Sequence, residues 1–283
     1  MAVTVTPLSD ACGAEISGVD MKSDLSKDDA STIYEAWLNH LVIVIRNQQD
    51  LTPKDQKDFC GNFGKVGEYN RPKDRQHPNH ASGEIMLVSN IREDGRVIGA
   101  HPDGEMMWHT DTPYLKTPHK ATTLYGVEIP DIGGNTNFSN QYKVYDDLSQ
   151  KLKDKLIGLQ AMNCYEFGTT IKTFEKYDRE AVPHHPHPIF RKHPETGRIA
   201  VYVCPLMTEE IIGMDETEGK EILNEIYTLQ RQDRFVYSHK WKVGDFVMWD
   251  NRCLLHARTD FPREQRRLLR RVTISDDSLV LAA

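Results

Sequence analysis

The sequence has few cysteines, and they form no recognisable pattern. Its 283 residues include five cysteines, at positions 12, 60, 164, 204 and 253, with no C-x-x-C pair among them. An odd and widely spaced set argues against a disulfide framework and against a cysteine-based zinc site. We therefore expect reduced cysteines that serve as packing residues in a cytoplasmic protein.

Excess positive charge and long apolar segments are also missing. Lys and Arg total 35 against 42 Asp and Glu, a formal net charge of −7. The one dense basic cluster, at 263–271, is interleaved with leucines, so we expect no nucleic-acid partner. No apolar run approaches the roughly 18 residues of a membrane span. The first residues also lack the basic and apolar regions of a secretory signal, and we expect no membrane partner.

What the chain does contain is a series of short β-strands separated by helices. Strands are predicted twice in the first 20 residues and then at 41–45, 85–88, 107–112, 121–127, 234–239, 246–249, 254–257 and 268–274. Helices are predicted at 26–40, 53–64, 144–156 and 209–232. Many strands with helical insertions predict a mainly β sandwich or barrel with helical cover, in a single domain over 1–283.

The stretch Trp108-His109-Thr110-Asp111-Thr112 places an imidazole and a carboxylate two residues apart. On an extended strand, residues i and i+2 share a face, so His109 and Asp111 can point at one place. With one more histidine they would form the two-histidine, one-carboxylate arrangement that suits non-haem Fe(II) and O₂. Such a pair also arises by chance on a surface, because the chain has 12 His and 42 acidic residues. Whether His109 and Asp111 form a metal site therefore depends on finding a further ligand elsewhere in the chain.

His256 is the best candidate for the third ligand. It lies in a β context about 145 residues after the pair, and early and late strands of a jelly roll can be neighbours. A second group, His184-His185-Pro186-His187-Pro188, is interrupted by prolines. We interpret that group as an irregular loop with solvent-facing imidazoles rather than as a metal site.

Arg267 and Arg271 indicate where organic acids could bind. Arg267 follows His256 by 11 residues, and on a strand Arg267 and Arg271 would share one face. A guanidinium binds a carboxylate through two parallel hydrogen bonds, so two of them on the metal-bearing face would suit a co-substrate and a substrate. The alternative is a solvated basic face on an acidic protein, and spacing alone does not choose between the two.

Four motifs follow one another along the chain: Trp108-His109-Thr110-Asp111, Gly133-Gly134-Asn135-Thr136, Trp249-Asp250-Asn251-Arg252 before His256, and Arg267 with Arg271. Together they resemble the taurine dioxygenase/2,4-D dioxygenase (TauD/TfdA) family of Fe(II)- and 2-oxoglutarate-dependent dioxygenases. The resemblance covers most of the chain and is strongest over 105–148 and 234–277.

The resemblance implies a double-stranded β-helix, a cupin-like jelly roll. Iron would be held by His109, Asp111 and His256, and 2-oxoglutarate would chelate it through its 2-oxo acid end. The far carboxylate of 2-oxoglutarate would be bound by Arg267 and by the hydroxyl of Thr136. Arg271 would then face the anionic group of the substrate.

The reaction implied is hydroxylation of a small anionic organic substrate at a C–H next to a heteroatom. It would consume O₂ and release succinate and CO₂. A homo-oligomer, either a dimer or a tetramer, is also expected.

One departure from the taurine-type enzymes bears on the substrate. Four residues before His109, where the taurine type has a substrate-binding Asn, this chain has Glu105, and Tyr69 stands near the place of a His. Unless Glu105 points outward, its carboxylate would repel a sulfonate or favour a cationic group. We therefore prefer an aryloxyalkanoate or similar carboxylate, with taurine, an alkylsulfonate or a zwitterion as alternatives. Tyr69, Asn70 and Glu105 are the candidate substrate contacts.

Two other classes of function remain as alternatives. A non-catalytic jelly-roll protein would use the same pocket to bind an organic acid, although an intact H-x-D and a later His argue against it. A zinc hydrolase would use the same three ligands, but the chain has no glutamate base in an H-E-x-x-H setting.

Overall fold

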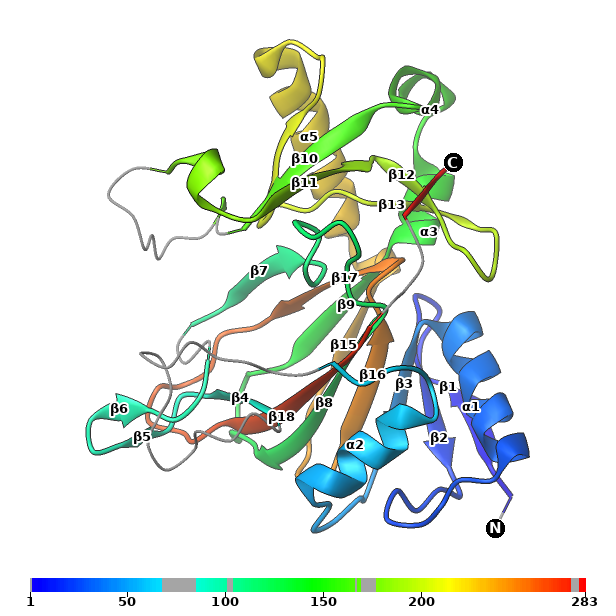
Figure 1. Ribbon diagram of the computed structural model, residues 1–283, viewed down its shortest axis with the longest axis vertical. Coiled ribbons are helices and arrows are strands. Elements are labelled where there is room, and N and C mark those ends of the chain that lie inside the picture. Colours follow the sequence, from blue (N-terminus) through cyan, green and yellow to red (C-terminus); the bar gives the residue numbers. More distant parts are fainter. Residues whose placement is uncertain (1, 68–84, 101–103, 166, 169–176, 276–279) are drawn as a thin grey trace.

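Two β-sheets that pack against each other form the main body of the protein (Figure 1). The computed structural model describes residues 2–67, 85–100, 104–165, 167–168, 177–275 and 280–283. The larger sheet has seven strands in the order β1 (Thr4–Pro7), β2 (Ala14–Ser17), β3 (Val42–Ile45), β16 (Phe246–Asp250), β8 (Ala121–Glu128), β18 (Leu268–Ile274) and β4 (Met86–Ser89). The smaller sheet has four, in the order β15 (Val236–His239), β9 (Thr136–Asn140), β17 (Leu254–Arg258) and β7 (Met106–His109).

Both sheets interleave strands from the two ends of the chain, as a jelly roll does. In the smaller sheet, the late strand β17 lies between the earlier strands β9 and β7 and pairs antiparallel with both. In the larger sheet, β8 lies between β16 and β18 and pairs antiparallel with both. The predicted mainly β jelly roll is therefore confirmed.

Helices cover the outer face of the larger sheet. The helix α1 (Lys27–His40) packs against β3 and β16, and α2 (Pro53–Gly61) packs against β18 (Figure 1). Trp37 of α1 and Phe59 of α2 are buried there, and the ring of Phe59 is 5.3 Å from that of Phe246. The two sheets enclose a second apolar core, in which Phe138 of β9 packs against Trp249 of β16 at 5.4 Å between ring centroids.

A group of helices and short strands is inserted between β9 and β15 and stands at one end of the sandwich, at the top of Figure 1. Its helices are α3 (Gln141–Asp147), α4 (Gln150–Leu156) and α5 (Glu216–Gln230), with short 3₁₀ turns at Arg179–Ala181 and Asp233–Phe235. Its strands are β10 (Gln160–Cys164), β11 (His184–Pro188), β12 (Phe190–Lys192), β13 (Ile199–Val201) and β14 (Thr208–Ile211). β19 (Leu281–Ala282) pairs with β12, and β5 (Arg92–Glu93) forms a separate hairpin with β6 (Arg96–Val97).

Two predicted helices have different bounds in the structure. The helix expected at 144–156 is two helices, because α3 ends at Asp147 and Ser149 caps the start of α4, where its side chain accepts the backbone N–H of Leu152. The prediction of a helix from 209 was wrong, since β14 occupies its first residues and pairs with β10. α5 begins only after Asp215, whose side chain accepts the N–H groups of the first helical turn.

The prediction of an irregular loop at His184-His185-Pro186-His187-Pro188 was also wrong. The segment is β11, an edge strand that pairs with β10. Proline fits an edge strand where its missing N–H would face outward, and the two prolines of β11 occupy alternate positions. His187 is only 2% exposed, and its Nε2 donates to the carbonyl of Leu115 at 2.8 Å. Burial lowers the pKa of His187 to about 4, so this imidazole is neutral.

All five cysteines are free and buried, as expected for packing residues. In the described part of the chain, no helix combines the length and the apolar character that crossing a membrane requires.

Candidate active site

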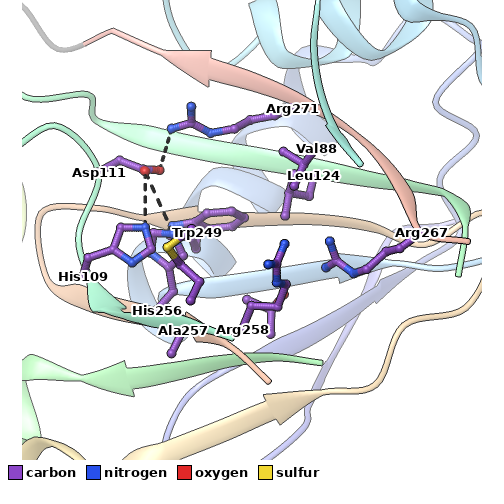
Figure 2. A pocket seen from close by; sticks show the side chains of 12 residues that line it. Val88, His109, Asp111, Leu124, Trp249, His256, Ala257, Arg258, Arg267 and Arg271 are labelled. Atoms are coloured by element: carbon purple, nitrogen blue, oxygen red, sulfur yellow. Dashed lines mark ion pairs between the residues drawn. The ribbon is translucent and has the colours of Figure 1, made fainter. Parts of the chain in front are cut away.

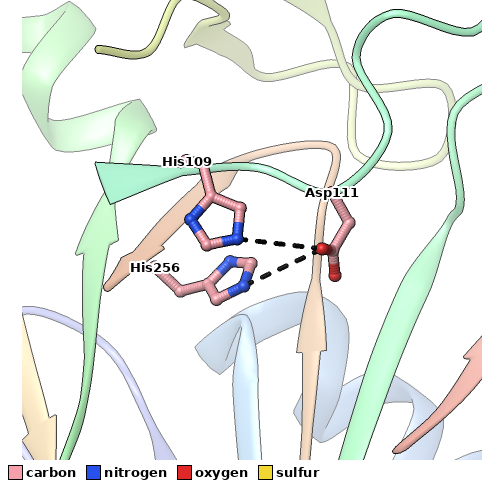
Figure 3. Close-up of side chains that lie close together, drawn as sticks. All are labelled: His109, Asp111 and His256. Carbon is pink, nitrogen blue, oxygen red and sulfur yellow. Dashed lines mark ion pairs between the residues drawn. The ribbon is translucent and has the colours of Figure 1, made fainter. Parts of the chain in front are cut away.

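Two neighbouring strands bring the three predicted metal ligands together. His109 at the end of β7 pairs across the ladder with His256 of β17, and their ring centroids are 4.1 Å apart (Figure 3). Oδ1 of Asp111 is 3.9 Å from Nε2 of His109 and 4.0 Å from Nε2 of His256. All three side chains are buried or nearly so.

A turn, rather than the alternation of a strand, aims Asp111 at the histidines. The strand predicted at 107–112 ends at His109, so Asp111 lies beyond it. Thr112 adopts a left-handed backbone with φ 55, which bends the chain at this point. The hydroxyl of Thr110 donates to the carbonyl of Asn251 at 2.7 Å and ties the turn to the segment just before β17.

The three side chains fit a single divalent metal ion. Their donor atoms all lie within 4.8 Å of one another. The separations of 3.9 and 4.0 Å do not exceed twice a typical bond of ~2.0–2.2 Å from such donors to a metal ion, so one ion can reach both donors of each pair. Nδ1 of His109 donates to the carbonyl of Met107 at 2.7 Å, which leaves the lone pair on Nε2 for the metal. Burial lowers the pKa of His109 and so favours the neutral imidazole that metal binding requires.

Contacts to Oδ2, the oxygen that points away from the histidines, hold the Asp111 carboxylate in place. Oδ2 accepts a hydrogen bond from the hydroxyl of Thr122 and pairs with Nη2 of Arg271 at 2.8 Å. Burial by itself would raise the pKa of Asp111, but Arg271, the two histidines and Thr122 outweigh it and hold that pKa well below its usual range. Asp111 is therefore ionised, with Oδ1 left to face the histidines.

A cavity of about 90 Å³ extends from the metal ligands between the two sheets (Figure 2), which is room for a small organic molecule rather than for one water. Besides the ligands, its polar lining consists of Thr136, Arg258, Arg267 and Arg271. Its apolar walls include Val88, Leu124 and Trp249. Of the predicted residues, Thr136, Arg267 and Arg271 thus share one cavity with the three candidate metal ligands.

Arg267 lies at the end of the cavity away from the metal ligands (Figure 2). It precedes β18 rather than lying within it, and it is 2% exposed. Nη2 donates to the carbonyl of Gly134 at 3.2 Å. Gly134 has φ +63, and a Cβ there would lie 3.0 Å from Nε of Arg267, so a side chain at 134 would crowd the guanidinium. Burial and the nearby charge of Arg258 lower the pKa of Arg267 to about 9, which leaves it charged at neutral pH.

Thr136 begins β9, and its side chain is buried. Its hydroxyl accepts a hydrogen bond from Nε1 of Trp241 at 3.0 Å. The hydroxyl hydrogen can therefore donate into the cavity. Neither Trp241 nor Arg258 was predicted as a site residue. The signal for Arg258 is its place two residues after His256, on the same face of β17.

The three predicted substrate contacts find no support in this cavity. Glu105 is exposed and is not among the described residues that line it. Tyr69 and Asn70 lie outside the described residues. A role for any of these three residues stays a prediction.

A second cluster of metal-ligand types, His193 with Asp250 and Cys253, is a hydrogen-bonded part of the core. Nδ1 of His193 accepts two backbone N–H groups, and Nε2 donates to Asp250 at 3.1 Å. Asp250 also pairs with Arg252 at 2.7 Å. Both ring nitrogens of His193 are therefore used within the protein.

The jelly roll, its two-histidine, one-carboxylate site and the basic pocket beside that site define a non-haem iron enzyme that works with an organic acid co-substrate. The sequence matches the family described as "Taurine catabolism dioxygenase TauD, TfdA family" over residues 4–273, and the chain belongs to this family. It is an Fe(II)- and 2-oxoglutarate-dependent dioxygenase, which confirms the predicted enzyme class and co-substrates.

Relatives match over almost their whole length. Pentalenolactone F synthase of Streptomyces avermitilis is 33% identical over 98% of this chain and 95% of its own. The alpha-ketoglutarate-dependent 2,4-dichlorophenoxyacetate dioxygenase of Cupriavidus pinatubonensis is 31% identical over 99% of this chain and all of its own. The crystal structure of AAD-2 with Mn(II) and N-oxalylglycine has a TM-score of 0.83 and 26% identity, covering 99% of this chain and 100% of that one.

Replacing Thr122 tests how the Asp111 carboxylate is held. We expect Thr122→Val to weaken Mn(II) binding about 10- to 100-fold, because the hydroxyl that orients Asp111 is lost while every ligand remains. Calorimetric titration of the metal-free protein with Mn(II) measures this. Thr228→Val is the matched control, since that hydroxyl bonds only within the exposed surface of α5. Equal Mn(II) affinity in the Thr122 variant and the wild type would contradict the assignment.

Proposed function

We propose that His109, Asp111 and His256 hold Fe(II), and that Arg267 and Thr136 bind the far carboxylate of 2-oxoglutarate. One observation carries this assignment. A single cavity has the metal donors at one end and the buried guanidinium of Arg267 at the other. A molecule with acid groups at both ends matches that polarity.

Fe(II) bound at this site with 2-oxoglutarate and O₂ supplies the oxidation of a C–H bond, with release of succinate and CO₂. The residues of the chain would orient the substrate next to the metal and keep water out of the cavity. Arg271 contacts Asp111 at 2.8 Å, so an anion bound by Arg271 would lie directly beside the metal ligands. The apolar side chains of Val88 and Leu124 exclude water from the same space.

For the substrate, we propose a small organic anion that carries a carboxylate on an apolar or aromatic body, such as an aryloxyalkanoate. Arg271 offers the paired donors that a carboxylate prefers, and Val88 and Leu124 offer apolar walls. The 2,4-dichlorophenoxyacetate dioxygenase among the relatives adds weight to this class. Because Glu105 is exposed rather than in the cavity, its charge gives no reason to reject sulfonates or sulfate esters, which therefore belong in the test.

A panel of anions tests the proposed substrate class. The Fe(II)-loaded protein is supplied with 2-oxoglutarate and, in separate reactions, 2,4-dichlorophenoxyacetate, 2-phenoxypropionate, hexyl sulfate and taurine. We expect succinate formation to be stimulated most by an aryloxyalkanoate. Stimulation only by the sulfur-containing acids would overturn the carboxylate preference. Binding of 2-oxoglutarate without turnover of any substrate would favour the organic-acid-binding alternative.

Arg271→Gln tests the proposed substrate contact. We expect KM for the best anionic substrate to rise about 10- to 100-fold, which corresponds to the loss of a hydrogen-bonded charge pair. KM for 2-oxoglutarate should change much less. Arg266→Gln is the matched control, since Arg266 is exposed and pairs with Glu128. An unchanged KM for the substrate in the Arg271 variant would exclude the contact.

We further infer that the chain works in the cytoplasm as a homo-oligomer. The five free, buried cysteines support a reducing compartment. A single-chain mass by light scattering in solution would exclude the oligomer, and recovery of the protein in a secreted fraction would exclude the location.

A further inference from the structure

Asn251 is a buried polar residue that lies two hydrogen bonds away from the carboxylate of Asp111. It follows β16 in the turn that leads to β17, and its side chain is fully buried. Two hydrogen bonds hold its amide. Nδ2 donates to Oγ1 of Thr122 at 2.9 Å, and Oδ1 accepts the indole N–H of Trp249 at 3.0 Å.

The strand register places these side chains next to the cavity. Thr122 of β8 and Trp249 of β16 are directly opposite each other in the ladder, so they share a face of the larger sheet. Leu124, on the same face two residues after Thr122, lines the cavity, and so does Trp249 (Figure 2). The ring of Trp249 is 4.8 Å from that of His256. The polar contacts of Asn251 therefore run along the wall of the candidate metal site.

The direction of each hydrogen bond in this chain follows from the groups that make it. An indole N–H can only donate, so the amide atom that faces Trp249 must be the oxygen, and the nitrogen must face Thr122. The amide nitrogen also only donates, so Oγ1 of Thr122 accepts from it. The single hydroxyl hydrogen of Thr122 is then left for Oδ2 of Asp111, which is the bond that the structure shows. Trp249 thus begins a chain of donors that ends on the Asp111 carboxylate.

The backbone of Asn251 contacts the two segments that position Asp111. Its carbonyl accepts the hydroxyl of Thr110 at 2.7 Å, and its N–H donates to the carbonyl of Lys120 at 3.1 Å. Thr110 immediately precedes Asp111, and Lys120 lies two residues before Thr122. One buried residue therefore contacts both the turn that carries the carboxylate and the segment that carries its hydroxyl partner.

We propose that Asn251 is a positioning residue, which orients the Asp111 carboxylate toward the metal through the hydroxyl of Thr122. Trp249 fixes the orientation of its amide. The proposal rests on the proposed function of the site, in which Asp111 binds Fe(II). Without the amide, the Thr122 hydroxyl would be free to turn its hydrogen away from Oδ2. Arg271 pairs with the same oxygen at 2.8 Å, so loss of the amide should weaken metal binding rather than abolish it.

A double-mutant cycle tests whether Asn251 acts through Thr122. Mn(II) is titrated by calorimetry into the metal-free wild type, Asn251→Leu, Thr122→Val and the protein with both substitutions. Leucine is close to asparagine in size but makes no hydrogen bond with its side chain. We expect Asn251→Leu to weaken Mn(II) binding about 10-fold. In the Thr122→Val background, the same substitution should change the affinity less than about twofold, because the hydroxyl through which Asn251 acts is already gone.

Trp249→Phe gives a second cycle that decides the question if Asn251→Leu does not fold. Phenylalanine keeps an aromatic ring beside His256 but removes the N–H that fixes the amide of Asn251. We expect Mn(II) binding to weaken about three- to tenfold. When Thr122→Val is already present, the further change should be less than about twofold.

Asn163→Leu is the matched control. Asn163 is a fully buried asparagine of β10, and its Oδ1 accepts the hydroxyl of Thr208 at 2.8 Å. It is not among the described residues that line the cavity. Its replacement should lower the melting temperature and leave the Mn(II) affinity unchanged.

Equal weakening by Asn251→Leu with and without the Thr122 hydroxyl would show that Asn251 affects the site only through the fold, and would overturn the proposal. Unchanged Mn(II) affinity in Asn251→Leu would overturn it as well. A wild type that binds no Mn(II) would instead refute the proposed metal site.

Discussion

The pairing of His109 with His256 is the contact on which the rest of the site depends. The two residues are far apart in the chain and meet only because β17 inserts between β7 and β9 in the smaller sheet. The same strand places Arg258 opposite Thr136. One ladder register therefore sets the positions of the metal donors and of the residues at the far end of the cavity, and a shift of one residue would turn each side chain to the other face.

A second feature of the site is that its charged side chains are buried and held in place by the protein itself. Asp111 is kept ionised by Arg271 and Thr122, while Arg267 and Arg258 are held by the backbone carbonyls of Gly134 and Gly104. Burying charged groups lowers stability unless each of them is paired or hydrogen-bonded. A guanidinium that the fold has already fixed loses less conformational entropy when an anion binds to it.

The sequence predicted which residues form this site better than it predicted the turn and the strand register that position them. The three candidate metal ligands, Thr136 and Arg267 stood out because their chemistry and order are specific. The turn that aims Asp111 was not predictable, since it depends on the backbone of Thr112 and on the tie from Thr110 to Asn251. Arg258 was not predicted to line the cavity, because its place there follows from the register between β17 and β9. His187 was misjudged because only the sheet shows that β11 is an edge strand, where prolines are tolerated.

If the candidate metal donors and the buried guanidinium of Arg267 form one binding site, 2-oxoglutarate should need both of them to bind. Calorimetric titration of 2-oxoglutarate into the wild type and into Arg267→Gln, each with and without Mn(II), measures this. We expect one molecule bound per chain, tight binding only when Mn(II) is present, and severe weakening by Arg267→Gln. Binding of 2-oxoglutarate that depends neither on the metal nor on Arg267 would contradict a shared site.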